Sequence, residues 1–365
     1  MYLRSLKLIN YKNYRQSEAH FKKPFVLING DNGSGKTNLI DAVYYLCICK
    51  SYFARQNNLL VRHGQDFFRL DGTFNTDADD IVITCKYQTD KKKEFLKNNA
   101  VYDRLSEHVG LIPVVMIAPD DIEIIHDGSE ERRKFLDTAI AQSDRVYLQR
   151  LILYNKILMQ RNALFRKMAE DGRRDHTLIN ALNHQLSEHG DFIYAERKKF
   201  VMTFTQTFTK MYQLLSDEKE RPSVTYQSAL AEQKHLQLLT DSLEKDIDAQ
   251  RTTTGIHRDD LKFEIDQYPL KETGSQGQIK SFLIAMKLAQ CSMITAATNK
   301  KPLLLLDDIF EKLDKKRLHI LFKMLKGNDF SQVFITDADE KRSVNYFEES
   351  NVEYDHLQVK NGEIV

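Results

Sequence analysis

The chain has 365 residues, of which 42% are hydrophobic and 29% are charged, as is ordinary for a globular protein with one large domain or two lobes. Its net charge is +1, so any contact with nucleic acid must come from local basic clusters. We find no apolar run of about 18 residues, no signal-peptide pattern and no zinc-type spacing of the cysteines. The expectation is a cytoplasmic protein without a membrane span.

The first part of the chain has an α/β pattern. Tyr2–Asn10 and Phe25–Asn29 are predicted to be strands, and Lys36–Cys49 is predicted to be a helix. A charged hairpin is expected at Asp90–Glu94. The other predicted strands are Phe67–Phe74, Ile81–Tyr87 and Ile112–Ala118. Residues 1–120 are therefore expected to form the first part of an α/β lobe.

From about Ser129 to Ser216 the apolar residues recur at helical spacing. Breaks are predicted at Asp171–Asp175 and at His189–Asp191, where glycine and charged residues cluster. The pattern predicts two or three helices in a hairpin or bundle, too short for a long coiled-coil arm. We assign residues 121–250 to an all-helical lobe.

The α/β pattern then returns. Strands are predicted at Leu261–Ile265, Leu303–Leu306 and Gln332–Thr336, and an amphipathic helix at Ser281–Ala297. Residues 251–365 are expected to complete the α/β lobe. The predicted fold is thus α/β, with the α/β lobe interrupted by an inserted all-helical lobe.

The octapeptide GDNGSGKT matches the phosphate-loop pattern GxxxxGK[ST] in full, between a predicted strand and a predicted helix. Its glycines let the backbone fold tightly, so that N–H groups point at phosphate oxygens; the alternative is a flexible glycine turn. Lys36 is predicted to place its charge on the β- and γ-phosphates, and the Thr37 hydroxyl to ligate Mg²⁺. The predicted nucleotide-binding residues of this loop are Gly30, Asp31, Asn32, Gly33, Ser34, Gly35, Lys36 and Thr37.

Four leucines followed by two acids, LLLLDD, form the second motif. An uninterrupted apolar run indicates a strand buried on both faces of a parallel sheet, and its carboxyl end is where such sheets bind ligands. We predict that Asp307 holds Mg²⁺ and that Asp308 orients or deprotonates the attacking water. Asp308 and Lys36 are therefore the candidate catalytic residues. The alternative is that Asp308 only caps a helix beginning near Ile309.

The stretch TGSQGQIKSF has the residues of a helix start, and a plain N-cap is the simpler interpretation of Ser275. It nevertheless opens the helix that leads into LLLLDD. The order of phosphate loop, insertion, Ser-x-Gly-Gln helix and acidic strand resembles the ABC-type ATPases. The resemblance implies that residues 1–120 and 251–365 form an ABC-type P-loop ATPase head, with the all-helical lobe inserted into it and no long coiled coil. This resemblance implies that Ser275, Gly277 and Gln278 contact the γ-phosphate of ATP bound by a second copy of the chain, in a two-fold dimer that holds two ATP molecules.

Transport ATPases of this class place the signature closer to the phosphate loop, follow the strand with Asp-Glu and carry a switch histidine. Here the insertion is long, the pair is Asp307-Asp308, and Asp337-Ala338 follow the last strand. These three features argue against a transport ATPase. The DNA-repair branch, to which the SMC heads are related, is therefore the better match, and a subunit of a transport or other non-DNA complex stays the alternative.

Within that branch the chain resembles the RecF family nearly from end to end. The matching stretches are LKLINYKNYR, GDNGSGKTNLIDAVYYL, APDDIEIIHDGSEERRKFLD, LYNKILMQRNALF, TTTGIHRDDLKF, SQGQIKSFLIAMKLA and LLLLDDIFEKLD. Two departures are Ile256, where the family has Pro, and Glu311, where it usually has Ser; Asp314 is the member of that second stretch expected at a dimer face.

The resemblance implies an ATP-dependent DNA-binding protein of recombinational repair and replication. It implies an ATP-gated homodimeric clamp on duplex or gapped DNA that helps to load RecA with RecO and RecR and supports SOS induction. Because the second acid is the shorter Asp and the switch histidine is absent, we expect a slow, DNA-stimulated ATPase that acts more as a gated binding protein than as a turnover enzyme.

Several further residues have two interpretations each. Lys12 and Asn13 are candidates to approach the adenine, or they form a strand-end turn. A second group is His257, Arg258 and Asp259. One interpretation places these residues near the nucleotide or the dimer interface, and the other is a structural polar cluster. Five basic clusters either contact DNA or lie on solvated surfaces: Lys91–Lys93, Arg132–Lys134, Arg173-Arg174, Arg197–Lys199 and Lys315–Arg317.

Overall fold

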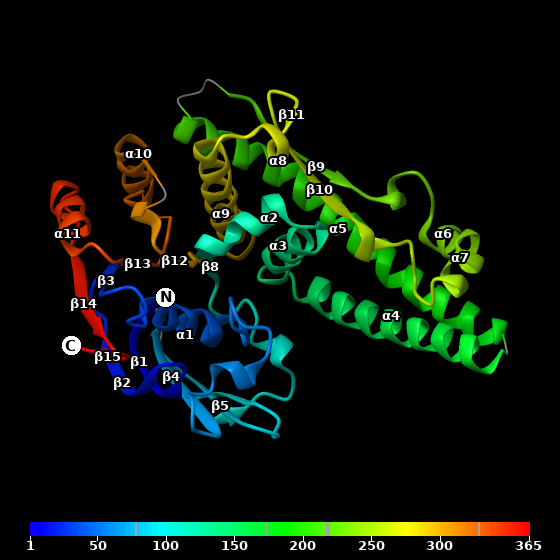
Figure 1. Cartoon of the computed structure of the whole chain (residues 1–365), viewed down its shortest axis with the longest axis horizontal. Coiled ribbons are helices and arrows are strands. Elements are labelled where there is room, and N and C mark those ends of the chain that lie inside the picture. Colours follow the sequence, from blue (N-terminus) through cyan, green and yellow to red (C-terminus); the bar gives the residue numbers. More distant parts are fainter. Residues whose placement is uncertain (77–78, 173, 217–219, 312, 328) are drawn as a thin grey trace. The chain divides into compact units, whose positions relative to one another are not determined.

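The computed structural model describes residues 1–76, 79–172, 174–216, 220–311, 313–327 and 329–365 (Figure 1). The chain divides into two compact units. The head unit comprises Met1–Asp121, Met211–Lys219 and Gln276–Val365, and the insert unit comprises Ile122–Lys210 and Glu220–Ser275. The insert unit thus extends to Ser275, beyond the limit at residue 250 that the sequence suggested.

A six-stranded sheet of order β15-β14-β3-β13-β12-β8 forms the base of the head unit. All of its strands are parallel except β15. The run of leucines in β12 is fully buried, as expected for a strand covered on both faces. The strands are β3 (Phe25–Asn29), β8 (Val114–Ile117), β12 (Leu303–Leu306), β13 (Gln332–Asp337), β14 (Tyr354–Lys360) and β15 (Glu363–Ile364).

A second, antiparallel sheet of order β2-β1-β4-β5-β6-β7 belongs to the same unit. Helix α1 (Lys36–Ile48) contributes to one core cluster with residues of both sheets, which is why eleven of its thirteen residues are buried. The strands are β1 (Tyr2–Tyr11), β2 (Tyr14–His20), β4 (Phe67–Asn75), β5 (Asp80–Gln88), β6 (Glu94–Lys97) and β7 (Ala100–Val101).

Three further helices complete the head unit: α9 (Gln276–Thr298), α10 (Lys315–Leu325) and α11 (Glu340–Glu349). Helix α9 is long and apolar enough to cross a membrane, but 67% of its most apolar window is buried inside the unit. It begins before the predicted Ser281 and is more buried than an amphipathic surface helix, since its residues Ser281–Cys291 are all buried. It is therefore a core helix, which satisfies the same length and composition criteria.

The insert unit is mostly helical, but it also contains a three-stranded antiparallel sheet of order β11-β10-β9 that the sequence pattern did not predict in full. Its strands are β9 (Pro222–Gln227), β10 (Asp260–Ile265) and β11 (Tyr268–Pro269). The helices are α2 (Glu123–His126), α3 (Ser129–Ala141), α4 (Arg145–Asp171), α5 (His176–Ser216), α6 (His235–Asp241), α7 (Leu243–Asp248) and α8 (Leu270–Thr273), with the end of α5 from Met211 counted in the head unit.

Short 3-10 helices connect these elements. They are η1 (Asn57–Leu60), η2 (Leu105–Glu107), η3 (Pro119–Ile122), η4 (Ala229–Ala231), η5 (Ile256–Arg258) and η6 (Ile309–Glu311).

One predicted helix break is confirmed and the other is wrong. Helix α4 ends at Asp171, and Gly172 follows in the left-handed conformation with φ 68°. The expected break at His189–Asp191 does not exist, because α5 runs through it. Gly190 is buried, and a Cβ there would lie 2.1 Å from Nδ1 of the His235 ring. The glycine therefore lets another part of the chain pack closely against the helix.

Two buried histidines, His108 and His235, and the half-buried His257 predict acid-sensitive stability. Burial lowers the pKa of His108, His235 and His257 from 6.5 to about 4 in each case. The unfolded chain therefore binds protons below pH 6.5 that the folded chain does not take up until about pH 4, so stability is complete above pH 6.5 and falls as the pH is lowered. Between pH 7 and pH 5 each histidine should lower the free energy of unfolding by about 2 kcal/mol.

The measurement is the melting temperature between pH 7.5 and pH 4.5. His257→Gln should weaken the dependence, whereas His20→Asn, which alters an exposed ring, should leave it unchanged. A melting temperature that stays level or rises as the pH falls would contradict the burial argument.

Candidate nucleotide site

The phosphate loop connects the parallel strand β3 to helix α1, as its sequence predicts. Gly30, Gly33 and Gly35 all have positive φ, at 155°, 79° and 120°. A Cβ on Gly30 would lie 2.2 Å from the carbonyl oxygen of Val359, and one on Gly35 would lie 2.5 Å from Nδ2 of Asn13. The loop therefore favours glycine at all three positions for its conformation, and at Gly30 and Gly35 for close packing as well.

The Lys36 side chain folds over this loop. Its Nζ donates to the carbonyl oxygens of Gly30, at 2.8 Å, and Asp31, at 3.1 Å. The residue is buried, with 4% of its surface exposed. Its ammonium group is thus held beside the backbone that, in this motif, surrounds a phosphate chain.

Two motifs far apart in sequence meet at the Thr37 hydroxyl. Its Oγ1 donates to the carboxylate of Asp307, with oxygen distances of 2.9 and 3.0 Å. Thr336, at the end of β13, also donates to Asp307 at 2.7 Å and accepts from the Asp308 backbone N–H at 2.9 Å. Strand β13 lies between β3 and β12, so Thr336 fixes the acidic motif; sequence reasoning did not identify this residue.

The donor set fits a Mg²⁺–nucleotide complex. A hydroxyl and one carboxylate are the few protein ligands that Mg²⁺ uses when phosphates and water supply the rest. Among the described residues there is no group of three or more His, Cys, Asp or Glu side chains that could hold a metal without such help. Within the same described part, the buried Ser34 hydroxyl in the loop has no hydrogen-bond partner, so a phosphate oxygen would give it one.

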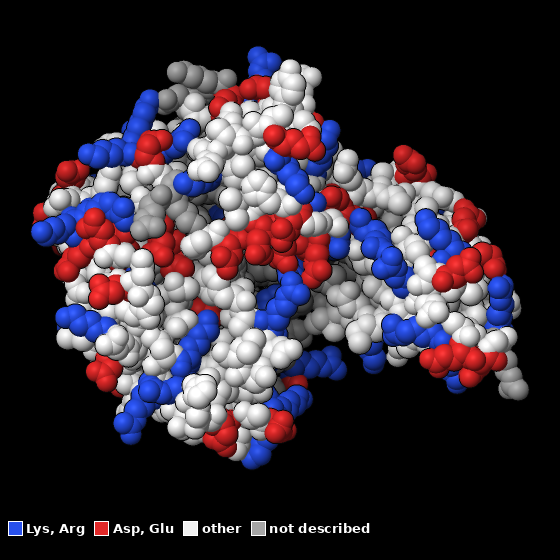
Figure 2. Space-filling model, viewed as in Figure 1, with Lys and Arg blue, Asp and Glu red and all other residues white. Residues whose placement is uncertain are grey.

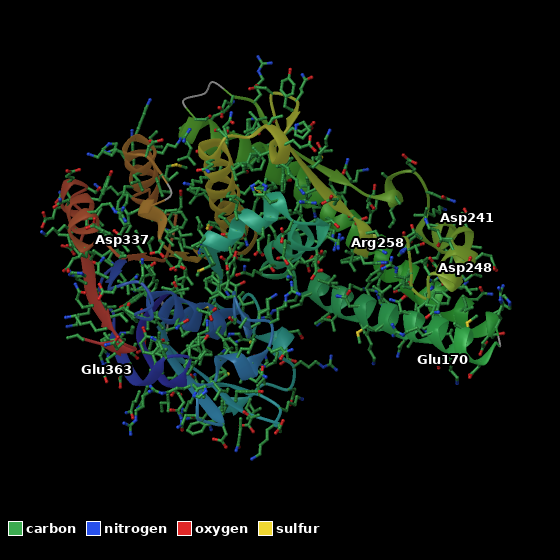
Figure 3. The ribbon with its side chains drawn as sticks, in the orientation of Figure 1. Glu170, Asp241, Asp248, Arg258, Asp337 and Glu363 are labelled. Atoms are coloured by element: carbon green, nitrogen blue, oxygen red, sulfur yellow. The ribbon has the colours of Figure 1, made fainter. Side chains whose placement is uncertain are left out.

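Asp308 adopts a left-handed conformation with φ 47°. For a residue other than glycine this is uncommon, and such conformations are concentrated at functional sites. Next to it on the sheet edge, the buried carboxylate of Asp337 pairs with Arg342, whose Nη2 lies 2.5 Å from Oδ1. The carboxyl ends of β12 and β13 thus carry Asp307, Asp308 and the Asp337–Arg342 ion pair. Figure 3 labels Asp337.

Lys12 and Asn13 have structural partners beside the loop. Lys12 Nζ lies 3.1 Å from the buried carboxylate of Asp41. Asn13 Nδ2 donates to the Ser34 carbonyl oxygen at 2.8 Å, and its Oδ1 accepts from Asn38 at 2.8 Å. Both residues lie at the turn between β1 and β2 and brace the phosphate loop and its helix; their approach to an adenine stays a prediction.

The three signature residues lie at a division of the chain. Ser275 is the last residue of the insert unit and is exposed, whereas Gly277 and Gln278 lie in the first turn of α9 in the head unit. A Cβ on Gly277 would lie 2.5 Å from Nη1 of Arg317, so the glycine lets the Arg317 guanidinium pack against this helix end. Asp314 caps α10 by accepting from the backbone N–H of Arg317 at 2.9 Å.

A buried ion pair joins α9 to the carboxyl end of β8, and sequence reasoning missed it. Lys287 Nζ lies 2.8 Å from Oδ1 of Asp121 and 2.8 Å from the Tyr52 hydroxyl, which itself contacts Asp121. The Lys287 and Asp121 side chains are 5% and 2% exposed. A lysine on an otherwise apolar helix face was the available signal, because such a charge requires a partner when buried.

The structure separates the five basic clusters into structural and exposed residues. Arg132 pairs with Asp260, Arg197 pairs with Asp137 and Asp259, and Lys134 pairs with Glu131. Arg173 lies outside the described residues, and Arg174 pairs with Glu244. The side chains of Lys91, Lys92, Lys198, Lys199, Lys315 and Lys316 are exposed. Figure 2 shows basic and acidic side chains interspersed over the described part of the visible face.

Comparison with known proteins agrees with this geometry. The family model described as RecF/RecN/SMC N terminal domain matches residues 2–361. The chain therefore belongs to this class of P-loop ATPase heads, of the ABC type and without a long coiled coil among its described residues. Solved Smc heads have the same fold: one bound to the C-winged helix domain of ScpA has a TM-score of 0.58 at 16% identity, over 100% of this chain and 97% of that one.

Within this class the chain belongs to the RecF family. It is 41% identical to the DNA replication and repair protein RecF of Flavobacterium johnsoniae over 346 residues, or 94% of this chain and 96% of that protein. It is 39% identical to RecF of Parabacteroides distasonis over 364 residues, covering 100% and 99%. A solved recombination mediator protein RecF-ATP in the RecFOR pathway has a TM-score of 0.90 at 29% identity, over 100% of this chain and 97% of that one.

Proposed function

We propose that the chain is an ATP-dependent DNA-binding protein of recombinational repair and replication. The observation that carries this proposal is the contact between Thr37 and Asp307, which joins a complete phosphate loop to an acidic strand in a chain of the RecF family. A relative solved with ATP supports the choice of nucleotide. That relative acts in the RecFOR pathway, which supports RecO and RecR as partners of this chain on DNA. A cytoplasmic location is consistent with a role in DNA repair.

ATP binding would use the chain's own groups as follows. The backbone of Gly30–Thr37 surrounds the phosphates, the Ser34 hydroxyl donates to one of their oxygens, and the Lys36 ammonium neutralises the β- and γ-phosphates. Thr37 and Asp307 hold Mg²⁺, which neutralises phosphate charge when bound. Thr336 keeps the Asp307 carboxylate in place.

Dimerisation would follow from the exposed helix tip. Ser275 and the first turn of α9, with Gly277 and Gln278, donate to the γ-phosphate held by a second copy, because a helix N-terminus favours an anion. The terminal phosphate then bridges two chains, so closure of the dimer is coupled to the nucleotide state. Since the contact is mutual in a two-fold pair, two ATP molecules are enclosed.

DNA would be held by the closed dimer through its phosphates, giving binding that weakens with salt and has little sequence preference. In this role the protein helps to place RecA on gapped DNA and supports SOS induction. The test is a titration of duplex and gapped DNA with ATP, ADP or no nucleotide: binding should require ATP. Equal affinity in all three conditions would contradict an ATP-gated clamp.

Replacement of Asp308 by Asn tests the hydrolysis step. We expect ATP affinity to be retained and turnover to fall about 100-fold or more, because the amide cannot accept the proton of the attacking water. The ATP-bound dimer should persist correspondingly longer. Steady-state phosphate release is the measurement, with Asp90→Asn at an exposed turn as the matched control. Turnover equal to that of the unmodified chain would remove Asp308 from the mechanism.

A further inference from the structure

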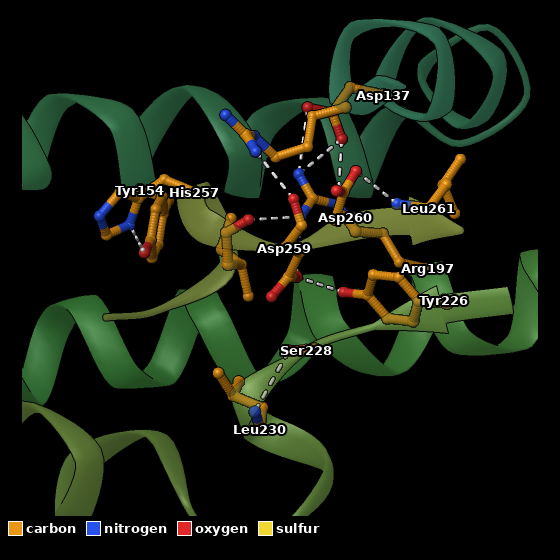
Figure 4. Close-up of polar contacts among 12 residues, drawn as sticks. Asp137, Tyr154, Arg197, Tyr226, Ser228, Leu230, His257, Asp259, Asp260 and Leu261 are labelled. Atoms are coloured by element: carbon orange, nitrogen blue, oxygen red, sulfur yellow. Dashed lines mark hydrogen bonds and ion pairs between the residues drawn. The ribbon is translucent and has the colours of Figure 1, made fainter. Parts of the chain in front are cut away.

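The segment Thr252–Asp260 of the insert unit, hereafter the anchored segment, is bonded to the rest of that unit at both of its ends. Figure 4 shows the contacts at the end that carries His257 and Asp259. At its start, the Thr252 backbone N–H and hydroxyl both donate to Asn162 Oδ1, at 2.7 and 2.8 Å. Arg161 donates to the same hydroxyl at 2.8 Å. Thr253 donates from its N–H to Asp246 at 2.8 Å.

The other end of the anchored segment is fixed equally firmly. His257 contacts the Tyr154 hydroxyl through Nδ1 at 2.8 Å and the Thr252 carbonyl oxygen through Nε2 at 3.1 Å. The Asp259 carboxylate accepts from Arg197 at 3.0 Å and from Tyr226. His257 and Asp259 therefore belong to a structural polar cluster, as one of the two interpretations of the sequence held.

Two buried arginine side chains form hydrogen bonds with the anchored segment. The side chains of Arg161 and Arg197 are 0% and 1% exposed. Arg161 pairs with the buried Asp246 at 2.7 Å. Removing either partner of such a pair would leave a buried charge without compensation, which is strongly destabilising. The network therefore constrains the conformation of the anchored segment.

Gly255 gives the same indication. Its φ is 121°, a conformation for which glycine is strongly favoured, and a Cβ would lie 2.7 Å from Nε2 of His235 and 2.8 Å from the Tyr154 hydroxyl. Directly after it, the Arg258 backbone N–H donates to the Gly255 carbonyl oxygen at 2.8 Å. The turn that carries Arg258 is therefore set by close packing and by a hydrogen bond.

The constrained backbone of the anchored segment carries one exposed arginine, Arg258. It lies between the anchored His257 and Asp259, yet its own side chain is exposed (Figure 3). Among the residues that the structure describes, it has no ion-pair or side-chain hydrogen-bond partner. Arg133 lies nearby, with its Nη1 donating to the Asp259 carbonyl oxygen at 2.8 Å. Desolvation by burial is the main cause that lowers the pKa of His257, and the charges of Arg258 and Arg133 lower it further.

We propose that Arg258, with Arg133 beside it, is a fixed contact point for a phosphate of the DNA backbone. The guanidinium group offers several donors in one plane, the geometry that suits a phosphate. Because its backbone is already rigid, little further ordering of the chain is needed when it binds. A contact of this type positions DNA without reading its sequence. The inference rests on the proposed DNA-binding function and adds a specific site to it.

The experiment titrates a fluorescent duplex with the full chain in Mg·ATP, at several salt concentrations. Arg258→Ala should weaken binding about tenfold and reduce the slope of log affinity against log salt by about one, and Arg258→Lys should restore much of the affinity. The matched control is Arg251→Ala, which removes an exposed arginine just before the anchored segment and should have little effect. Melting temperature, ATP affinity and ATP-dependent mass should be unchanged in Arg258→Ala.

Three outcomes would overturn the inference. If Arg258→Ala binds DNA as the unmodified chain does, with the same salt slope, Arg258 does not contact phosphate. If the variant loses its ATP-dependent mass change, Arg258 serves the contact between chains instead. If the unmodified chain itself fails to bind DNA in Mg·ATP, the proposed function fails and this site with it, which distinguishes that failure from the first one.

Discussion

A chain carrying Lys36→Ala is expected to lose ATP affinity by on the order of 100-fold or more, because the alanine removes the charge that neutralises the β- and γ-phosphates. The native ammonium group lies within 2.8 to 3.1 Å of two carbonyl oxygens of the loop, so its position beside the loop backbone is already defined. Loss of ATP binding should also abolish every ATP-dependent property, including dimerisation and DNA binding.

Equilibrium binding of a fluorescent ATP analogue is the direct measurement. Lys22→Ala, which removes an exposed lysine of the head unit, is the matched control and should bind ATP normally. Because Lys36 is buried, the melting temperature of the variant must be measured as well. A folded Lys36→Ala chain with unchanged ATP affinity would show that the phosphate loop does not hold the nucleotide.

The second large effect is expected from Ser275→Arg. Ser275 is exposed and lies outside the phosphate loop, so the fold and the chain's own ATP affinity should stay within about threefold, while the bulky cation should block the approach of a second chain. The ATP-dependent dimer should therefore be lost. Thr203→Arg, which adds the same group at another exposed hydroxyl position, should still dimerise.

Mixing the two variants separates a shared site from an internal one. Lys36→Ala retains an intact Ser275, and Ser275→Arg retains an intact phosphate loop. If the helix tip serves the neighbouring chain, one complete site can form in the mixed pair, and part of the dimer should return with ATP. If Ser275 serves the nucleotide of its own chain, neither variant has a complete site and the mixture should stay monomeric.

The parts of the site that could be predicted were those encoded locally. The phosphate loop and the LLLLDD strand each lie within eight consecutive residues, and the structure brings Thr37 and Asp307 into contact. The roles of these two residues toward Mg²⁺ stay predictions. Thr336 was not predicted, because a threonine at a strand end has no distinctive pattern and its role depends on β13 lying between β3 and β12.

Contacts between residues far apart in the sequence explain why the other predictions differ from the structure. Gly190 suggested a helix break, yet it exists to admit the His235 ring. Arg197 suggested a basic surface, yet its side chain is buried against Asp137 and Asp259. A charge pattern along the sequence cannot distinguish a solvated arginine from a buried one, since the partners are tens of residues away and only the tertiary structure brings them together.

The measurement that tests the central claim most directly is the mass of the protein in solution with Mg²⁺ and a slowly hydrolysed ATP analogue, with ADP and without nucleotide, each in the presence and absence of duplex DNA. The account predicts a monomer in ADP and without nucleotide, and a dimer of twice the 42.6 kDa chain mass with the ATP analogue. A chain that remains monomeric at saturating ATP analogue, with and without DNA, would contradict the account.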